Sequence, residues 1–229
     1  VIATLAEDGI AVQPHPDLAG ALRVTEGARR VQGSRAYREG LVELQDLSPQ
    51  LACAALPVRA GTRGLDYCAG GGGKALALAA RGAQVTAWDA DPARMRDLPV
   101  RAARAGVRIV RAGPAGPRGT FDLVVTDVPC SGSGTWRRTP NAKWRMSEAA
   151  LTDLTARQDA ILDAAARHVA PGGELAYMTC SVFTAENGDR IAAFLARRSG
   201  FRLVEMQNFT PLDAGDGFFL ARLQALTAC

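Results

Sequence analysis

The chain has little lysine, little histidine and no long apolar run. Of its 27 lysines and arginines only Lys74 and Lys143 are lysine, and histidine occurs twice. The excess of arginine fits a composition bias, yet both lysines lie inside the motifs described below, where a compact ammonium has a use. No run of about eighteen apolar residues is present, and the N-terminus lacks the charged start and apolar stretch of a secretory signal. We therefore expect a soluble, cytoplasmic protein without a membrane partner.

The cysteines lack the paired short spacing of a zinc site, and their number, 5, is odd. With 229 residues, 48% of them apolar, the chain can bury one full-sized core without disulfide staples. We expect reduced thiols and no bound metal. The formal net charge of +4 favours an anionic partner, although an ordinary basic surface explains it equally well.

From residue 65 onward short apolar segments alternate with helical patterns, which is typical of an α/β protein with a doubly wound parallel sheet. Strands are predicted near 64–68, 84–89, 107–110, 121–126, 174–178, 202–205 and 218–223. Helices are predicted over 47–56, 74–80, 92–105, 147–169 and 185–198.

Residues 1–45 show no strong strand alternation, and we expect a small, partial N-terminal accessory module there, followed by the main domain at 46–229. The chain begins with Val1 rather than methionine, so whether further sequence precedes Val1 stays an open question.

Four consecutive glycines, 70–73, follow the first predicted strand and directly precede Lys74. Ligands of such sheets bind beyond the carboxyl ends of the strands, and glycines let the backbone approach a ligand closely. A nucleotide-binding P-loop is disfavoured, because Cys68 and Ala75 stand where glycine and serine or threonine are needed. A dinucleotide and S-adenosylmethionine both remain possible ligands, with Asp89 after the second strand available for ribose hydroxyls.

Two cysteines each end an apolar run, Cys130 after Asp127 and Pro129, and Cys180 after a later strand. Carbon 5 of cytosine accepts a methyl group only after a thiolate adds to carbon 6, and a second group must then remove the carbon-5 proton. The pattern of acid, proline and thiol favours a base-modifying methyltransferase over a dehydrogenase, with Asp127 at the ring edge and Pro129 fixing the turn. Buried structural thiols, or a disulfide between the two, are the alternatives.

Tryptophans alternate with basic residues beyond this motif. The residues are Trp136, Arg137, Arg138, Lys143, Trp144 and Arg145. Such a segment suits stacking and phosphate contacts with single-stranded RNA, whereas half-buried tryptophans among ordinary surface arginines explain it nearly as well.

Together these motifs resemble the RNA 5-cytosine methyltransferases of the RsmB/Sun/Nop type, with most similarity to the bacterial RsmB-like enzymes of 16S rRNA. The matching segments are LDYCAGGGGK at 65–74, DVPCSGSG at 127–134, RRTP at 137–140, KW at 143–144, TCS at 179–181, EN at 186–187 and GDGFF at 215–219, preceded by REG at 38–40 and QD at 45–46. The resemblance spans residues 37–229 and implies a Rossmann-like, S-adenosylmethionine-dependent methyltransferase fold. It also implies methylation of a cytosine in RNA, with rRNA as the expected substrate, tRNA as the alternative, and an accessory module that is a truncated RNA-binding unit.

The resemblance implies a role for each matching residue. Cys180 would be the nucleophile on carbon 6, Cys130 would assist proton removal or product release, and Lys74 would stabilise the activated base. Asp127 would contact the ring edge and the cofactor. The implied cofactor-binding residues are Cys68, Ala69, Gly70, Gly71, Gly72, Gly73, Lys74, Asp89 and Asp127. The implied RNA-binding residues are Arg137, Arg138, Lys143 and Trp144.

The chain departs from the family pattern in two places. The family usually has Pro-Gly-Gly-Lys-Thr in the first loop, and here Gly71 takes the proline position and Ala75 the threonine position. After the third strand Ala112 and Gly113 stand where the family often has an acidic residue near the adenine. These departures motivate the alternative of a non-catalytic, RNA-binding relative. A DNA cytosine methyltransferase is strongly disfavoured because it would leave Cys180 idle. We expect a monomer.

Overall fold

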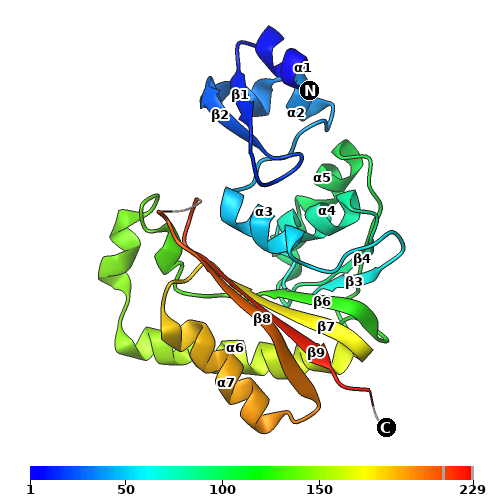
Figure 1. The fold of residues 1–229 in the computed structure, drawn as a ribbon, viewed down its shortest axis with the longest axis vertical. Coiled ribbons are helices and arrows are strands. Elements are labelled where there is room, and N and C mark those ends of the chain that lie inside the picture. The colour runs from blue at the N-terminus through cyan, green and yellow to red at the C-terminus, as the bar shows by residue number, and fades with distance from the viewer. Residues whose placement is uncertain (213–214, 228–229) are drawn as a thin grey trace.

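A seven-stranded sheet forms the centre of the computed structural model, which describes residues 1–212 and 215–227 (Figure 1). The strand order is β5–β4–β3–β6–β7–β9–β8. The strands are β3 (Arg63–Asp66), β4 (Gln84–Ala87), β5 (Ile109–Arg111), β6 (Phe121–Asp127), β7 (Val169–Thr179), β8 (Phe201–Phe209) and β9 (Phe218–Ala225). The first five of these pair in parallel, and β9 runs antiparallel between β7 and β8. All seven predicted strands are present, and the expected α/β, Rossmann-like fold class is confirmed.

Helices cover both faces of the sheet (Figure 1). They are α3 (Leu47–Ala54), α4 (Gly73–Ala80), α5 (Leu98–Arg104), α6 (Glu148–Ala165) and α7 (Gly188–Arg197). Alternate residues of a strand point to opposite faces. In β6, accordingly, Leu123 and Val125 join the core cluster with α3, α4 and α5, and Val124 joins the cluster with α6 and α7. Within the two described ranges, no helix is long and apolar enough to cross a membrane.

Four of the five predicted helices are shorter in the structure. Helix α3 ends at Ala54 rather than at 56, and α7 covers Gly188–Arg197 of the predicted 185–198. The prediction over 92–105 is divided into the 3-10 helix η2 (Pro92–Met95) and α5, because Pro99 fits only the first turn of a helix and starts α5 anew. The prediction over 147–169 ends at Ala165, where η5 (Ala166–His168) follows. Strand β7 begins at Val169, five residues before the predicted start at 174. Its Pro-Gly-Gly segment, 171–173, is accommodated by a positive φ of +74° at Gly172 and by a register shift against β6.

Residues 1–45 contain a two-stranded antiparallel sheet that the sequence did not predict. The elements are α1 (Ile2–Glu7), β1 (Ala11–Pro14), β2 (Leu22–Glu26), η1 (Ala28–Gly33) and α2 (Arg35–Arg38). A small core of their own consists of Leu5, Ile10, Val31 and Ala36. The strand pattern is weak because Val12, Leu22 and Val24 are only partly buried against this core. These elements lie above α3 and α5 in Figure 1.

The carboxyl ends of the parallel strands bring polar residues to one edge of the sheet. Asp66 ends β3, Asp127 ends β6, Thr179 ends β7, and Asp89 follows β4 two residues after its last residue. Three short 3-10 helices complete this edge: η3 (Ser133–Thr135), η4 (Pro140–Arg145) and η6 (Thr184–Glu186). The site described next is built from these loops.

Candidate active site

Cys130 and Cys180 lie side by side at the ends of β6 and β7. The parallel register pairs Asp127 with Met178, so the residues that follow the two strands emerge at the same place. The amide of Val128 donates to the carbonyl of Met178 at 3.0 Å and extends this pairing past the end of β6. The two Sγ atoms are 3.4 Å apart and share a hydrogen bond. The structure therefore brings together the two thiols that the sequence singled out.

The surroundings make the two thiols chemically different. The pKa of the Cys180 thiol is lowered, chiefly because the Cys130 thiol donates a hydrogen bond to its sulfur. The ammonium of Lys74 also lowers this pKa, whereas burial and the carboxylate of Asp127 raise it. The pKa of the Cys130 thiol is raised because its proton is held in that hydrogen bond and because it is buried. Cys180 is therefore the sulfur that ionises first, and Cys130 is its proton-bearing partner.

Lys74 and Asp127 form an ion pair beside the thiols. Nζ of Lys74 is 2.5 Å from Oδ2 of Asp127, and the two side chains are 18% and 27% exposed. Burial opposes the Lys74 ammonium, but the carboxylate of Asp127 outweighs it, so the pKa of Lys74 is raised. Asp66 lies below this pair, and burial together with repulsion from Asp127 raises its pKa to about 7. Lys74 thus stays positively charged next to Cys180.

Two carboxylates brace the glycine loop. Oδ2 of Asp89 accepts the amide of Gly70 at 3.0 Å, and Oδ2 of Asp66 accepts the amide of Ala75 at 3.0 Å. Gly72, at φ +87°, has no space for a side chain, because a Cβ there would lie 2.2 Å from Leu98. Asp89 therefore holds the glycine loop in shape, a role that the sequence did not predict.

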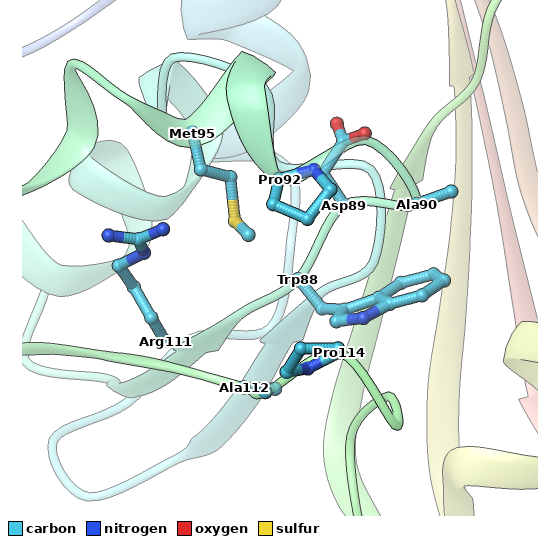
Figure 2. A pocket seen from close by; sticks show the side chains of 9 residues that line it. Trp88, Asp89, Ala90, Pro92, Met95, Arg111, Ala112 and Pro114 are labelled. Carbon is cyan, nitrogen blue, oxygen red and sulfur yellow. The ribbon is translucent and has the colours of Figure 1, made fainter.

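A cavity of about 500 Å³ opens next to Asp89, between the ends of β4 and β5 (Figure 2). Its lining residues are Trp88, Asp89, Ala90, Pro92, Met95, Arg111, Ala112, Gly113 and Pro114. The volume lies within the usual range of small-molecule sites. Sequence reasoning identified only Asp89 as a binding residue here. The others follow β4 and β5, so the rule that ligands bind beyond strand ends could have indicated them.

A buried carboxylate joins the loops that carry the two thiols. Oε1 of Glu186 accepts the amide of Ser131 at 2.8 Å and Nε2 of Gln158 at 2.9 Å. Oε2 accepts the hydroxyl of Ser181 at 2.5 Å and the hydroxyl of Ser131. Ser131 follows Cys130 and Ser181 follows Cys180, so one side chain holds both loops. The sequence contained Glu186 in a matching segment but did not indicate this role.

The segment expected to bind RNA divides into two parts. Arg137 and Arg138 both pair with Asp216, Arg137 at 2.9 Å, and the side chain of Asp216 is only 3% exposed. Lys143 and Trp144 are exposed, and Nζ of Lys143 lies 4.6 Å from the ring centroid of Trp144. Trp144 is 79% exposed and open to stacking. All four side chains therefore lie at the surface, with the two arginines, 54% and 57% exposed, engaged in ion pairs.

Among residues 1–212 and 215–227, no group of three or more His, Cys, Asp or Glu side chains is arranged to hold a metal ion. The site described above consists of a thiol pair, an ion pair, a glycine loop and a cavity.

Sequence comparison relates this chain to ribosomal RNA methyltransferases. A family model described as 16S rRNA methyltransferase RsmB/F matches residues 53–224. Ribosomal RNA small subunit methyltransferase B of Klebsiella pneumoniae is 37% identical, over 97% of this chain and 55% of its own length. The chain thus spans about half the length of this relative.

Solved structures show the same fold. A protein named PH0851 superposes with a TM-score of 0.88 at 30% identity, over 97% of this chain and 55% of that protein. NSun6 from Pyrococcus horikoshii, solved with SFG, superposes with a TM-score of 0.75 at 22% identity, over 91% of this chain and 60% of its own. At that identity the second likeness concerns the fold alone.

Proposed function

The chain belongs to the 16S rRNA methyltransferase RsmB/F family, and on that premise we propose that it moves the methyl group of S-adenosylmethionine to carbon 5 of a cytosine in RNA. We propose rRNA as the substrate, because the family description and the relative's name both refer to it. The observation that carries the proposal is the pair of sulfurs of Cys130 and Cys180, 3.4 Å apart and with opposite pKa shifts. Methylation at carbon 5 needs one nucleophilic thiol and one group that handles a proton.

The residues at the sheet edge fit S-adenosylmethionine, which supplies an electrophilic methyl group when bound. The cavity beside Asp89 has the size for a nucleoside, and Met95 and Pro114 give it apolar walls suited to an adenine ring. Asp89 lines this cavity (Figure 2), and its carboxylate is the group that we propose as acceptor for the ribose hydroxyls. The glycine loop, 70–73, opens α4 toward the same edge.

Cys180 begins the reaction in this proposal. Its thiolate forms a bond to carbon 6 of the cytosine, and carbon 5 becomes nucleophilic. Lys74 stabilises the electron density that moves onto the ring, and Asp127 keeps the ammonium in place through their 2.5 Å contact. The target cytosine must leave its stack to reach Cys180, so single-stranded or flipped nucleotides are the substrates.

Cys130 completes the reaction. While Cys180 is a thiolate, their hydrogen bond raises the pKa of Cys130. Once the Cys180 sulfur is bonded to carbon 6 it carries no charge, and the largest cause of that raised pKa disappears. Cys130 can then give its proton to water, and its thiolate takes the proton from carbon 5. The electron pair of that C–H bond restores the ring double bond, and the bond between carbon 6 and sulfur breaks to return Cys180 as a thiolate.

The test is transfer of radiolabelled methyl from S-adenosylmethionine to total RNA that lacks its native 5-methylcytosines. We expect label on cytosine with the intact chain and none with Cys180→Ala, which should still bind the cofactor in calorimetry. We expect Cys130→Ala to accumulate a covalent RNA adduct, retained on a denaturing gel. Cys53→Ala is the matched control, because Cys53 is a buried thiol outside the hydrogen-bonded pair, with its pKa raised to about 12 by burial.

Three outcomes would count against the proposal. Normal turnover by Cys180→Ala removes Cys180 from the mechanism, and a missing adduct with Cys130→Ala removes the role given to Cys130. An intact chain that binds RNA but gives no heat with S-adenosylmethionine would indicate the non-catalytic relative instead. Label found in tRNA rather than rRNA would retain the chemistry and change the substrate.

A further inference from the structure

The glycine loop is held from outside by an arginine of α5. Nη1 of Arg101 donates to the carbonyl of Gly71 at 2.5 Å. Elsewhere in the loop, the amide of Gly70 is held by Asp89 and the amide of Gly72 donates to the carbonyl of Ala69 at 2.8 Å. Arg101 is thus the side chain that restrains the middle of a four-glycine segment, whose backbone is otherwise free to adopt many conformations.

Arg101 is itself oriented by an acid from the N-terminal segment. Its Nε lies 3.4 Å from Oε2 of Glu43, and the same oxygen pairs with Nη2 of Arg104 at 2.5 Å. The side chains of Arg101, Arg104 and Glu43 are 22%, 16% and 25% exposed. The guanidinium of Arg104 also stacks on the ring of Tyr37 at 3.9 Å. Because these groups are shielded from water, their charges interact more strongly than surface pairs do.

A continuous set of contacts therefore runs from residues 1–45 to the glycine loop. Tyr37 and Glu43 contact α5 through Arg104, Glu43 orients Arg101, and Arg101 holds Gly71. We propose that Arg101 is a positioning residue that keeps the glycine loop in its cofactor-binding shape and couples the N-terminal segment to cofactor affinity. The inference rests on the proposed function, because the loop is taken to bind S-adenosylmethionine.

The backbone at Gly71 suggests how the role of Arg101 can be isolated. Gly71 is not among the glycines with positive φ, and in the described part of the chain its amide donates no hydrogen bond, so a proline there would sacrifice no backbone donor. A Cβ at Gly71 would lie 3.0 Å from Nη1 of Arg101. A proline at this position and the arginine would therefore occupy neighbouring space, and each can stiffen the loop in the absence of the other.

The experiment measures the Kd of S-adenosylmethionine by calorimetry on the full chain and its variants. We expect Arg101→Ala to raise the Kd about tenfold, the usual effect of losing one charge-assisted hydrogen bond. Adding Gly71→Pro to Arg101→Ala should recover most of this lost affinity, since a proline restricts the backbone conformation at the position that Arg101 restrains. Arg108→Ala, an exposed arginine just beyond α5, is the matched control and should bind as the parent does.

The rescue distinguishes positioning from a general loss of stability, because a proline in the loop does not restore the Glu43 ion pairs. If Arg101→Ala does not fold, Glu43→Gln provides the test, with a severalfold rise in Kd expected. An Arg101→Ala variant that binds like the parent, or a loss that Gly71→Pro does not reduce, overturns the inference while leaving the proposed function intact. An intact chain that binds no cofactor overturns both.

Discussion

Cys180 differs from the other buried cysteines because a donor faces its sulfur. Burial raises the pKa of the thiols of Cys53 and Cys68, since the charged form loses its hydration. Cys180 is partly buried as well, yet its pKa is lowered, because the Cys130 thiol donates to it and the ammonium of Lys74 is near. At the scale of single residues, the ionisation of Cys180 therefore depends on one hydrogen bond, with 3.4 Å between the two sulfurs, more than on its exposure.

We expect the ionisation of Cys180 to depend on Cys130. In the parent chain, alkylation of Cys180 by iodoacetamide should rise with pH and reach half its maximum below 9.0, the ordinary value of a thiol pKa. Cys130→Ala removes the donor, so the thiolate is less favoured and the midpoint should move upward by about 1 pH unit. Mass spectrometry of the Cys180 peptide across a pH series measures this. An unchanged midpoint would show that the hydrogen bond does not govern ionisation.

At the scale of elements, the two thiol-bearing loops are fastened together by a carboxylate from η6. Glu186 is fully buried and accepts donors from the loop after β6, the loop after β7 and helix α6. Thr179, the residue before Cys180, donates to Oδ1 of Asn187 at 2.6 Å and joins the end of β7 to the start of α7. Because Glu186 lies on η6 and Gln158 on α6, the separation of the two sulfurs depends on how these two elements pack against the loops.

We expect Glu186→Ala to lower the free energy of unfolding by about 3 kcal/mol, because four donors, two buried and two part-buried, lose their acceptor. Glu186→Gln keeps one oxygen for Ser131 and Gln158, and should cost about 1 kcal/mol. Both variants should lower kcat for methyl transfer and leave the Kd of S-adenosylmethionine unchanged, since Glu186 contacts the thiol loops and not the glycine loop. Urea unfolding and calorimetry test this, with Asp189→Asn, at an exposed acid of α7, as the control. A matching loss of cofactor affinity would contradict it.

For the whole molecule, the N-terminal residues are joined closely to the sheet domain. They have a small core of their own, but Gly40 packs its backbone directly against the end of α5. A Cβ at Gly40 would lie 1.7 Å from the carbonyl oxygen of Arg104, and the residue has φ +75°. The junction therefore requires glycine for both space and conformation.

We expect Gly40→Ala to lower the free energy of unfolding by about 2 kcal/mol, or roughly 4–8 °C in Tm, because the side chain must displace backbone. Gly33→Ala is the control, since nothing lies within 4 Å of a Cβ there and its φ is not positive. Differential scanning calorimetry measures both. Equal Tm values for the two variants would show that the junction tolerates a side chain.

The order of the main elements could be predicted from the sequence because strand and helix patterns depend on neighbouring residues. All seven strands were found, and so were the polar residues that follow them, including Asp89, Asp127 and Cys180. The hairpin at 11–26 was missed because its apolar side chains are half-buried, and the division of the helix at 92–105 was missed although Pro99 marked it.

By itself the sequence determined which residues stand at strand ends and which motifs they form, since these are properties of local spacing. Only the tertiary structure decided that Cys130 contacts Cys180, that Glu186 joins their loops, and that Arg101 holds Gly71. It also placed Arg137 and Arg138 on Asp216. Such contacts join residues that are distant along the chain. Their geometry follows from how strands register and helices pack, and no local pattern encodes that.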